Sequence, residues 1–474
     1  MAGDVRPIRA RRASPAARTL AVLTALSLAA ASAPIQAQPR PENAGIPLIR
    51  DAEIEQLLRE YTTPILRAAG LGPQNVQVVI INDRTFNAFV MDGRRIFVNS
   101  GALFESTTPN QIIGVLAHES GHIAGGHLAK MRQELANAQT QLILATVLGV
   151  GAMVASAKGG GAGQNAGQIG MAALTAPQEM IKRSLLSYVR AQEEQADKAG
   201  VKFLAATGQS AKGMYDTFRR FADQTMFTAR GVDPYVQSHP MPVERVRALE
   251  EVGRSSPNWD KKDSPELQLR HDMMRAKLSA FMDRPDTIAR RYPASDASLP
   301  ARYARAISAY RFSDVRSAVA QIDALIAVQP NNPYFYELKG QALLESGRGA
   351  EAVAPLRRAA ALAPNAHLIR AMLAQALVST RDAKHADEAI AILRDVLIHE
   401  KELVSGYREL AQAYGQKGDL AQADLASAQA SFASGDFKTA RELAARAKTR
   451  LPTGSPGWVK ADDIATYRPK NPTN

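Results

Sequence analysis

The sequence predicts a mainly α protein that begins with a small antiparallel β-sheet and ends in an all-α solenoid. Short runs of β-branched residues occur between residues 76 and 98, and long helical patterns follow them up to about residue 300. From about residue 301 to residue 452 the chain becomes rich in Ala and Leu, with breaks at regular intervals. With 474 residues, the chain is long enough to form several domains, each with a hydrophobic core of its own.

The composition excludes several classes of protein. The chain has no cysteine, so it forms no disulfide framework, no cysteine-ligated metal site, no iron–sulfur cluster and no thiol nucleophile. A bound metal ion must therefore be held by His, Asp or Glu, and the chain has only 8 His. The 58 Lys and Arg exceed the 46 Asp and Glu, which gives a formal net charge of +12. No block of Lys or Arg interleaved with aromatic residues accompanies this charge, so we expect no binding of nucleic acid.

Residues 1–37 have the order of a secretory signal peptide, with arginines first, an apolar run over residues 19–33 next, and then a cleavage-site segment that ends at Ala37. The apolar run is shorter than the roughly 20 residues that a membrane span needs, so we expect cleavage near Ala37 and not a retained anchor. Cleavage would lower the net charge from +12 to +8. Export of a chain without cysteine favours a bacterial periplasm, where a positive charge suits work beside an anionic membrane surface.

The β-branched runs predict the strands of the sheet. The strongest candidates are residues 76–81 and 95–98, and between them lie residues 87–90 and a turn at Asp92-Gly93. We expect these segments to pair as a small antiparallel sheet.

A helix start follows the sheet. Thr108 is a suitable N-cap residue, Pro109 suits the first helical position, and Gln111 completes a capping box. The spacing predicts one helix from Pro109 to about Leu135.

The last third of the chain carries an internal repeat. Residues 329–333 read Gln-Pro-Asn-Asn-Pro and are echoed by Ala-Pro-Asn at residues 363–365, and the matching prolines lie 34 residues apart. This is the period of tetratricopeptide repeats, whose helix pairs stack into a superhelix that binds protein segments. We expect about four repeats between residues 301 and 452, with an insertion of about three residues near Ala389. An unrelated helical bundle is the alternative.

The strongest local signal is His118-Glu119-Ser120-Gly121-His122, within the helix expected from Pro109. Two His four residues apart lie about one turn apart on the same face of a helix, so both imidazoles can reach one zinc ion. Glu119 lies beside this face, where its carboxylate can take a proton from the attacking water and give it to the leaving amine. Two surface histidines on a helix are the alternative, but the motif is rare by chance in a chain with 8 His.

A catalytic zinc site needs a third protein ligand, and the sequence offers two sources. His127 follows His122 by five residues, which is a turn of about 140° around a helix and away from the site. We therefore interpret His127 as a residue behind the ligands or on the surface. The other source is the acidic helical stretch from Arg190 to Asp197, in which Glu193 and Asp197 are four residues apart. One of these carboxylates can ligate the metal while the other accepts a hydrogen bond from a ligand His.

Together the two motifs resemble the gluzincin family of metallopeptidases, which includes CAAX prenyl protease and HtpX-like protease. The segments at residues 98–103 and 238–245 also match that family. The resemblance implies a zincin-like α+β metalloprotease domain over residues 38–270 with one Zn²⁺ per chain. It implies that the metal is held by His118, His122 and Glu193. It also implies that Asp197 supports the site.

The same resemblance points to further site residues. It implies that Asn87, Ala88 and Phe89 belong to an edge strand, which pairs with extended substrate through its backbone. The signal peptide and the repeats narrow the match to periplasmic, repeat-bearing members, in which the His matching His239 occupies the open position of the metal and keeps the enzyme inactive. Stabilisation of the transition-state oxyanion and a purely structural role are the other readings of His239. Arg245 is expected either to bind substrate or to pair with an acidic neighbour.

An uncharged run at residues 142–157 lies between the two metal motifs. It is shorter than the roughly 20 residues of a membrane span, so a buried helix is the usual interpretation. The resemblance adds a second one, an apolar hairpin that rests on the outer membrane. The Gly-rich residues 159–163 follow no strand and lack a Lys-Ser/Thr pair, which excludes a phosphate-binding loop.

The sequence therefore predicts a periplasmic zinc metalloendopeptidase with repeats that bind proteins. By resemblance, its substrates are misassembled outer-membrane β-barrel proteins, and its partners include their assembly machinery. A chaperone or assembly adaptor with a latent or residual protease is the alternative. The expected parts are a signal peptide at 1–37, the metalloprotease domain at 38–270, a helical linker at 271–300, the repeat domain at 301–452 and a tail at 453–474.

Overall fold

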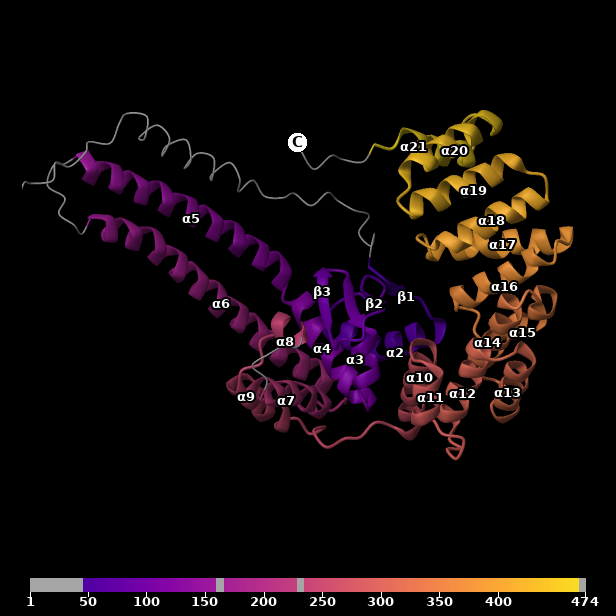
Figure 1. Cartoon of the computed structure of the whole chain (residues 1–474), viewed down its shortest axis with the longest axis horizontal. Coiled ribbons are helices and arrows are strands. Elements are labelled where there is room, and N and C mark those ends of the chain that lie inside the picture. Colours follow the sequence, from indigo (N-terminus) through magenta and orange to yellow (C-terminus); the bar gives the residue numbers. More distant parts are fainter. Residues whose placement is uncertain (1–45, 159–165, 228–233, 469–474) are drawn as a thin grey trace, which may run out of the picture.

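The computed structural model describes residues 46–158, 166–227 and 234–468 of the chain. Figure 1 shows a sheet surrounded by helices, two long helices that project from it, and a curved stack of helices formed by the C-terminal part. The expected signal peptide and the Gly-rich residues 159–163 lie outside the described residues.

The sheet has four strands in the order β1-β2-β4-β3, so β3 is an edge strand. The pairs β1–β2 and β3–β4 are antiparallel, but β2 and β4 run parallel, so the prediction of a fully antiparallel sheet is wrong. The reason is that the chain leaves β2, forms β3 first, and returns through the turn at Gly93 to place β4 between them. The strand bounds are Leu48–Ile49 (β1), Gln77–Ile81 (β2), Ala88–Asp92 (β3) and Arg95–Asn99 (β4).

One hydrophobic core joins the sheet to the helices of this part, and α4 lies near its centre. α4 contacts α6, α7 and β3, and its residues Val115 and Leu116 are fully buried together with Val98 of β4 and Phe218 of α7. Side chains carried by α4 are therefore held between packed elements. The helix bounds are Ala52–Ala68 (α2), Ser100–Glu105 (α3), Pro109–Ala124 (α4), His127–Lys158 (α5), Ala166–Ala206 (α6), Lys212–Phe227 (α7), Pro234–Ser238 (α8) and Val243–Arg254 (α9).

α4 begins with the capping box that the sequence predicts. It ends at Ala124, however, and α5 begins at His127, so the predicted single helix to Leu135 is wrong. Gly126 has a φ of 62°, a left-handed backbone conformation that glycine adopts at little steric cost. This glycine separates the two helices and redirects the chain.

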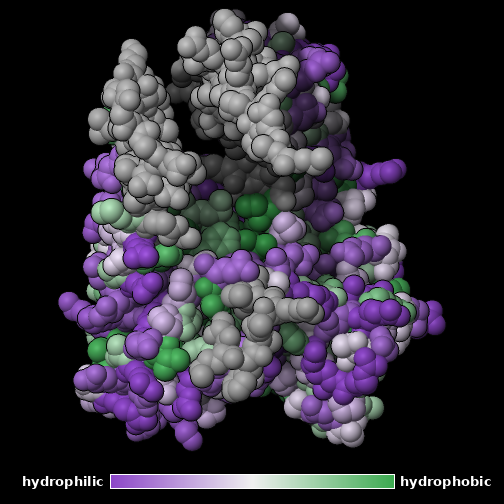
Figure 2. All heavy atoms as spheres, turned by 60° about the vertical axis from the view of Figure 1, so that its left-hand side comes forward, coloured by the Kyte–Doolittle hydropathy of each residue, from purple (hydrophilic) through white to green (hydrophobic). Residues whose placement is uncertain are grey.

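α5 and α6 lie side by side as a long pair that projects from the rest of the domain (Figure 1). The uncharged residues 142–157 lie in α5, and Leu142, Ile143 and Leu144 at its start are exposed, which contradicts a buried helix at these positions. Among the described residues, no helix has the length and apolar character needed to pass through a bilayer. Figure 2 brings this side of the molecule forward, and its coloured surface is mostly hydrophilic, with hydrophobic atoms gathered in a hollow near the middle.

Two helices connect this part to the solenoid. The first of them, α10, belongs to both, because Met274 and Leu278 pack in the core around α4 whereas Met273 and Ala276 pack in the core of the first repeat helices. The expected linker at 271–300 thus starts inside a helix that both parts share. The bounds are Pro265–Met282 (α10) and Pro285–Arg291 (α11).

The C-terminal part is a stack of helix pairs with the predicted period. The first helices of successive pairs begin at Leu299, Pro333, His367 and Val404, so they are 34, 34 and 37 residues apart. The predicted insertion lies in α17, which has 17 residues where α13, α15 and α19 have 14. α21 lies in the expected tail. The bounds are Leu299–Phe312 (α12), Val315–Val328 (α13), Pro333–Glu345 (α14), Gly349–Leu362 (α15), His367–Ser379 (α16), Ala383–His399 (α17), Val404–Gln416 (α18), Leu420–Ala433 (α19), Phe437–Arg450 (α20) and Pro456–Thr466 (α21).

Candidate metal centre

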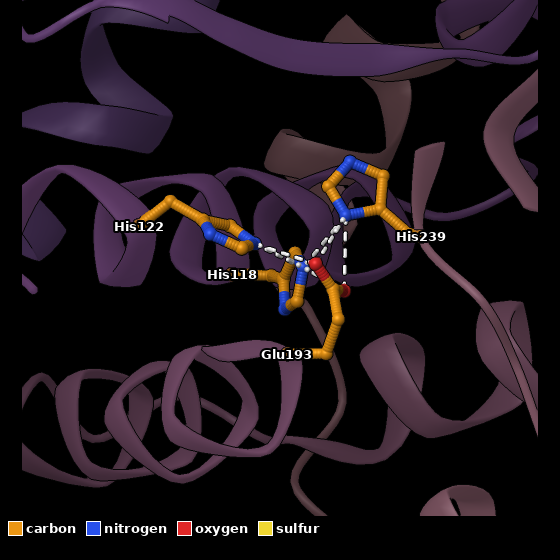
Figure 3. A group of neighbouring side chains, drawn as sticks. All are labelled: His118, His122, Glu193 and His239. Atoms are coloured by element: carbon orange, nitrogen blue, oxygen red, sulfur yellow. Dashed lines mark hydrogen bonds and ion pairs between the residues drawn. The ribbon is translucent and has the colours of Figure 1, made fainter. Parts of the chain in front are cut away.

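Four side chains meet in one buried cluster (Figure 3): His118 and His122 of α4, Glu193 of α6, and His239, which directly follows α8. One donor atom of each lies within 4.8 Å of those of the other three. Nε2 of His118 is 3.1 Å from Nε2 of His122 and 3.3 Å from Nδ1 of His239. The Glu193 carboxylate is 3.4 Å from Nε2 of each α4 histidine and 3.0 Å from Nδ1 of His239.

These distances fit a small metal ion. A tetrahedral ion with bonds of about 2.0–2.1 Å separates its ligand atoms by about 3.3 Å. Three imidazole nitrogens and one carboxylate form a donor set that suits zinc. The cluster therefore has both the spacing and the chemistry of a metal site.

Asp197 and Arg245 lie next to the cluster, where Asp197 contacts His118 and Arg245 contacts Glu193, and both are buried. Oδ1 of Asp197 is 2.9 Å from Nδ1 of His118, which leaves Nε2 of that ring facing the cluster. Arg245 donates to Asp197 from Nε at 2.6 Å and from Nη2 at 2.8 Å, and its Nη1 lies 2.8 Å from Glu193. The structure thus places Arg245 against acidic neighbours.

These contacts shift the pKa values of the two α4 histidines in opposite directions. Burial disfavours the charged form of both, but Asp197 and Glu193 overcome it and raise the pKa of His118 to about 9. Burial lowers the pKa of His122 to about 3, because the contact with Glu193 does not compensate for it and the charge of His118 adds to it. Burial also opposes ionisation of Glu193, but His239 and His118 hold its pKa well below the usual value, so Glu193 is an ionised, ligand-ready carboxylate.

Glu119 is fully buried beside the cluster. Its Oε1 is 3.5 Å from Nε2 of His239, and among the described residues neither of its carboxylate oxygens has a hydrogen-bond partner. Burial raises the pKa of Glu119, against the lowering effect of His239 and His118. A buried carboxyl group with a raised pKa can both accept and release a proton, as general acid/base catalysis requires.

The expected substrate-binding residues lie on the edge strand beside the cluster. Nε2 of His239 is 3.2 Å from the carbonyl oxygen of Ala88, at the start of β3. Asn87 precedes this strand, and its Oδ1 accepts from Oγ of Ser238 at 3.5 Å. Phe89 follows Ala88 within β3. The segment that carries His239 is therefore in contact with the edge strand.

His127 lies directly behind His122. The two Nδ1 atoms are 3.0 Å apart, and His127 is only 4% exposed. A continuous helix would turn His127 away from the site, but α4 ends at Ala124, before that residue.

Aromatic side chains that were not predicted from the sequence pack around the cluster. Phe218 packs edge-on against His118, with ring centroids 5.2 Å apart, and also lies under the guanidinium of Arg245. The ring of Tyr235 lies 4.8 Å from that of His239. The four-residue spacing of Tyr235 and His239 was a usable signal, whereas nothing local to α7 points to Phe218.

Residues 49–252 match the model of peptidase family M48, and residues 303–367 match a tetratricopeptide repeat. The chain contains a peptidase family M48 domain. All four residues of the cluster lie within the M48 match, and the protein is a metallopeptidase with repeats. The resemblance predicted from the motifs is thereby confirmed.

Curated relatives that are named as proteases align with this chain. Beta-barrel assembly-enhancing protease of Yersinia pestis is 24% identical over 422 residues, which cover 88% of this chain and 83% of the relative. The protein of that name from Escherichia coli (strain K12) is 23% identical, over 86% of this chain and 82% of the relative. Metalloprotease LoiP of the same strain is 32% identical over 151 residues, or 32% of this chain and 52% of the relative.

Proposed function

We propose that the chain is a zinc metalloendopeptidase, exported to the periplasm, that hydrolyses peptide bonds in misassembled outer-membrane β-barrel proteins. The observation that carries the proposal is the buried cluster of His118, His122 and Glu193 with Glu119 beside it. The single cluster of this kind within the described ranges supports one Zn²⁺ per chain. Periplasmic localisation follows from the signal peptide expected at residues 1–37.

In the proposed mechanism the protein holds an ion and moves a proton. His118, His122 and Glu193 would hold the zinc ion, which when bound polarises the scissile carbonyl and makes water more acidic. Glu119 takes the proton of the attacking water and delivers it to the nitrogen of the leaving amine. Its burial and raised pKa suit both halves of this transfer. Asp197 keeps Nε2 of His118 turned toward the ion.

The edge strand β3 is the proposed binding site for extended substrate. An edge strand has free backbone donors and acceptors along one side, and these pair with extended chains of many sequences. Asn87, Ala88 and Phe89 would make these contacts. Because Ala88 lies 3.2 Å from His239, a paired substrate would pass next to the cluster.

His239 is proposed to hold the enzyme inactive until its segment moves. Its Nδ1 is 3.0 Å from Glu193 and 3.3 Å from His118, distances at which it would take the fourth corner of a tetrahedral site. A catalytic zinc site needs this position open. Activation then requires movement of the segment from Ser238 to Arg245.

The repeats are proposed to bind substrates and the β-barrel assembly machinery. The two relatives named beta-barrel assembly-enhancing protease align with most of the chain. A cleft of about 870 Å³ lies between α2, α10 and the first repeats, lined by Glu60, Arg270, Tyr334 and His367 among others. Its volume is enough for several side chains of a bound segment.

Peripheral contact with the outer membrane is proposed for the α5–α6 pair. Leu142, Ile143 and Leu144 follow one another on α5 and are exposed, and Met180 on α6 is 70% exposed. Apolar side chains gathered on a projecting pair of helices favour contact with an apolar partner or a membrane surface.

A chaperone or assembly adaptor with a latent protease is the second candidate function. The position of His239 in the cluster favours it, because a metal site with a filled fourth position is silent. The same chain would then act mainly by binding through its repeats.

The substitution Glu119→Gln tests the proposed function. With purified full-length protein and an unfolded β-barrel protein as substrate, we expect cleavage to slow by about 10²–10⁴-fold while the zinc content stays unchanged. Glu194→Gln is the matched control, because Glu194 is an exposed neighbour on α6 that pairs with Lys198, and it should keep the full rate. If outer-membrane quality control in cells survives Glu119→Gln at a normal protein level, binding and not proteolysis is the main activity.

A further inference from the structure

We propose that His127 is a positioning residue that holds the His122 ring in the orientation and tautomer that turn Nε2 toward the metal. This inference rests on the proposed function, because it assigns a role toward the zinc ion. Nδ1 of His127 lies 3.0 Å from Nδ1 of His122, while Nε2 of His122 lies 3.1 Å from Nε2 of His118. The His122 ring is thus held between the cluster and His127.

The contact determines where the protons of both rings lie. A neutral imidazole carries one N–H, and a metal ligand must present its unprotonated nitrogen. With Nε2 of His122 facing the cluster, its proton belongs on Nδ1, which then donates to Nδ1 of His127. His127 can accept this bond only with its own proton on Nε2. The side chain of Gln195 on α6 is a further polar neighbour of the His127 ring.

The backbone keeps His127 in this place. The residue is 4% exposed and stands at the first position of α5, directly after the turn that ends α4. A Cβ atom at Gly125 would come within 2.2 Å of the His127 ring, so glycine at this position allows the ring to lie where it does. The carbonyl oxygen of His127 accepts from Nε2 of Gln192 at 3.2 Å, one residue before Glu193 on α6. After the turn, the chain therefore passes over His122, and this hydrogen bond connects it to α6, the helix that carries Glu193.

The two α4 histidines differ in what lies behind them. His118 has the carboxylate of Asp197 at 2.9 Å, whereas His122 has an imidazole at 3.0 Å. Both partners can accept from Nδ1–H, and such acceptors fix the ring orientation of ligand histidines. The imidazole does so without adding a further carboxylate charge to those of Glu193 and Asp197. Loss of His127 should therefore loosen His122 as a ligand without changing the formal charge of the site.

Zinc affinity of the full-length chain tests this role. All proteins carry Glu119→Gln, which prevents self-digestion and leaves the three ligands in place. His127→Asn keeps an oxygen acceptor near the place of Nδ1, whereas His127→Phe keeps a ring but removes the acceptor. Competition with a zinc chelator at neutral pH gives the dissociation constant, and thermal unfolding of the metal-free protein reports damage to the fold.

We expect His127→Phe to weaken zinc binding about 10- to 100-fold, with His127→Asn within about threefold of the parent. Both metal-free variants should unfold at the temperature of the parent. Unchanged zinc affinity in His127→Phe would overturn the positioning role of His127. Equal losses of zinc affinity in both variants, together with a lower unfolding temperature, would also overturn it and would leave His127 a structural role only. A parent that binds no zinc would overturn the proposed function as well, so the two failures are distinguishable.

Discussion

Nε2 of His239 lies 3.2 Å from the carbonyl oxygen of Ala88, and this contact joins the metal cluster to the edge of the sheet. The amide of Asn99 on β4 donates to the carbonyl of Asn87, so in an antiparallel ladder the backbone of Ala88, one residue further, points away from β4. The carbonyl that an added strand would use is therefore the one that His239 contacts. Pairing of substrate at Ala88 and the position of His239 in the cluster exclude each other.

The substitution His239→Ala is expected to raise proteolysis, because it frees both the fourth position of the cluster and the edge carbonyl. One hydrogen bond contributes about 0.5–1.5 kcal/mol net, so freeing the edge carbonyl alone should raise the rate by up to about tenfold, and freeing the fourth position adds to this gain. Initial rates on an unfolded β-barrel protein measure the change, with His239→Ala/Glu119→Gln as the inactive control. A lower rate would instead support the other reading of His239, stabilisation of the transition-state oxyanion.

Asp197→Asn is expected to weaken both the metal site and the fold, because its carboxylate faces His118 and Arg245 at once. Arg245 is 8% exposed, and without Asp197 its charge has only Glu193 as an ionic partner, so the free energy of unfolding should fall by about 1–3 kcal/mol. The double variant Asp197→Asn/Arg245→Met removes that charge and should regain most of the stability. Zinc affinity should stay about 10- to 100-fold lower in both. Urea unfolding and chelator competition measure the two effects, and recovery of both by the double variant would mean that Asp197 serves the fold alone.

The part of the site that the sequence predicts is the part that local spacing determines. His118 and His122 lie four residues apart on α4, and Glu193 and Asp197 lie four residues apart on α6. In each pair, the helical period alone puts both side chains on one face. The packing of α4 against α6 depends on the whole core, so it was inferred from family resemblance and not from the spacing. The structure brings these four side chains together.

What the sequence failed to predict depends on contacts between remote segments. The parallel pairing of β2 with β4 results from the order in which the strands fill the sheet, which no single strand encodes. The break after Ala124 did have a local signal, Gly125-Gly126, but glycine is tolerated within helices. The packing of His127 against His122 distinguishes a break from a continued helix, and it is visible only in three dimensions.

Gly340→Ala is expected to destabilise the repeats without affecting the metal site. Gly340 is buried on α14, and a Cβ atom there would lie 2.3 Å from Cγ of Leu356, so overpacking should cost about 1–3 kcal/mol. Gly415→Ala on α18 is the control, because a Cβ atom there meets nothing within 4 Å, and it should gain about 0.5–1 kcal/mol of helix stability. Urea unfolding measures both. Equal effects of the two variants would mean that the Gly340 site can relax around a methyl group.

A buried charge network joins the two parts of the chain. Nζ of Lys277 on α10 lies 2.7 Å from Asp51, 3.1 Å from Glu53 and 3.9 Å from Glu337 of the repeat helix α14. The hydroxyl of Tyr303 donates to Glu53, so the carboxylates share one cation and one hydroxyl. Burial raises the pKa of Glu337 to about 8, because Lys277 compensates only in part and the neighbouring carboxylates oppose ionisation.

This raised pKa predicts that stability falls as the pH rises. Between the ordinary value of 4.5 and about 8, the folded chain binds more protons at Glu337 than the unfolded chain does, so the stabilisation is full below pH 4.5 and is lost toward pH 8. Each pKa unit corresponds to about 1.4 kcal/mol, so the loss should be on the order of a few kcal/mol. Glu337→Gln keeps the neutral form at every pH and should flatten the curve of unfolding free energy against pH, whereas Glu442→Gln, at an exposed position on α20, should leave it unchanged. Parallel curves for the parent and Glu337→Gln would mean that Glu337 stays ionised in the folded chain, because Lys277 alone then suffices to hold its charge.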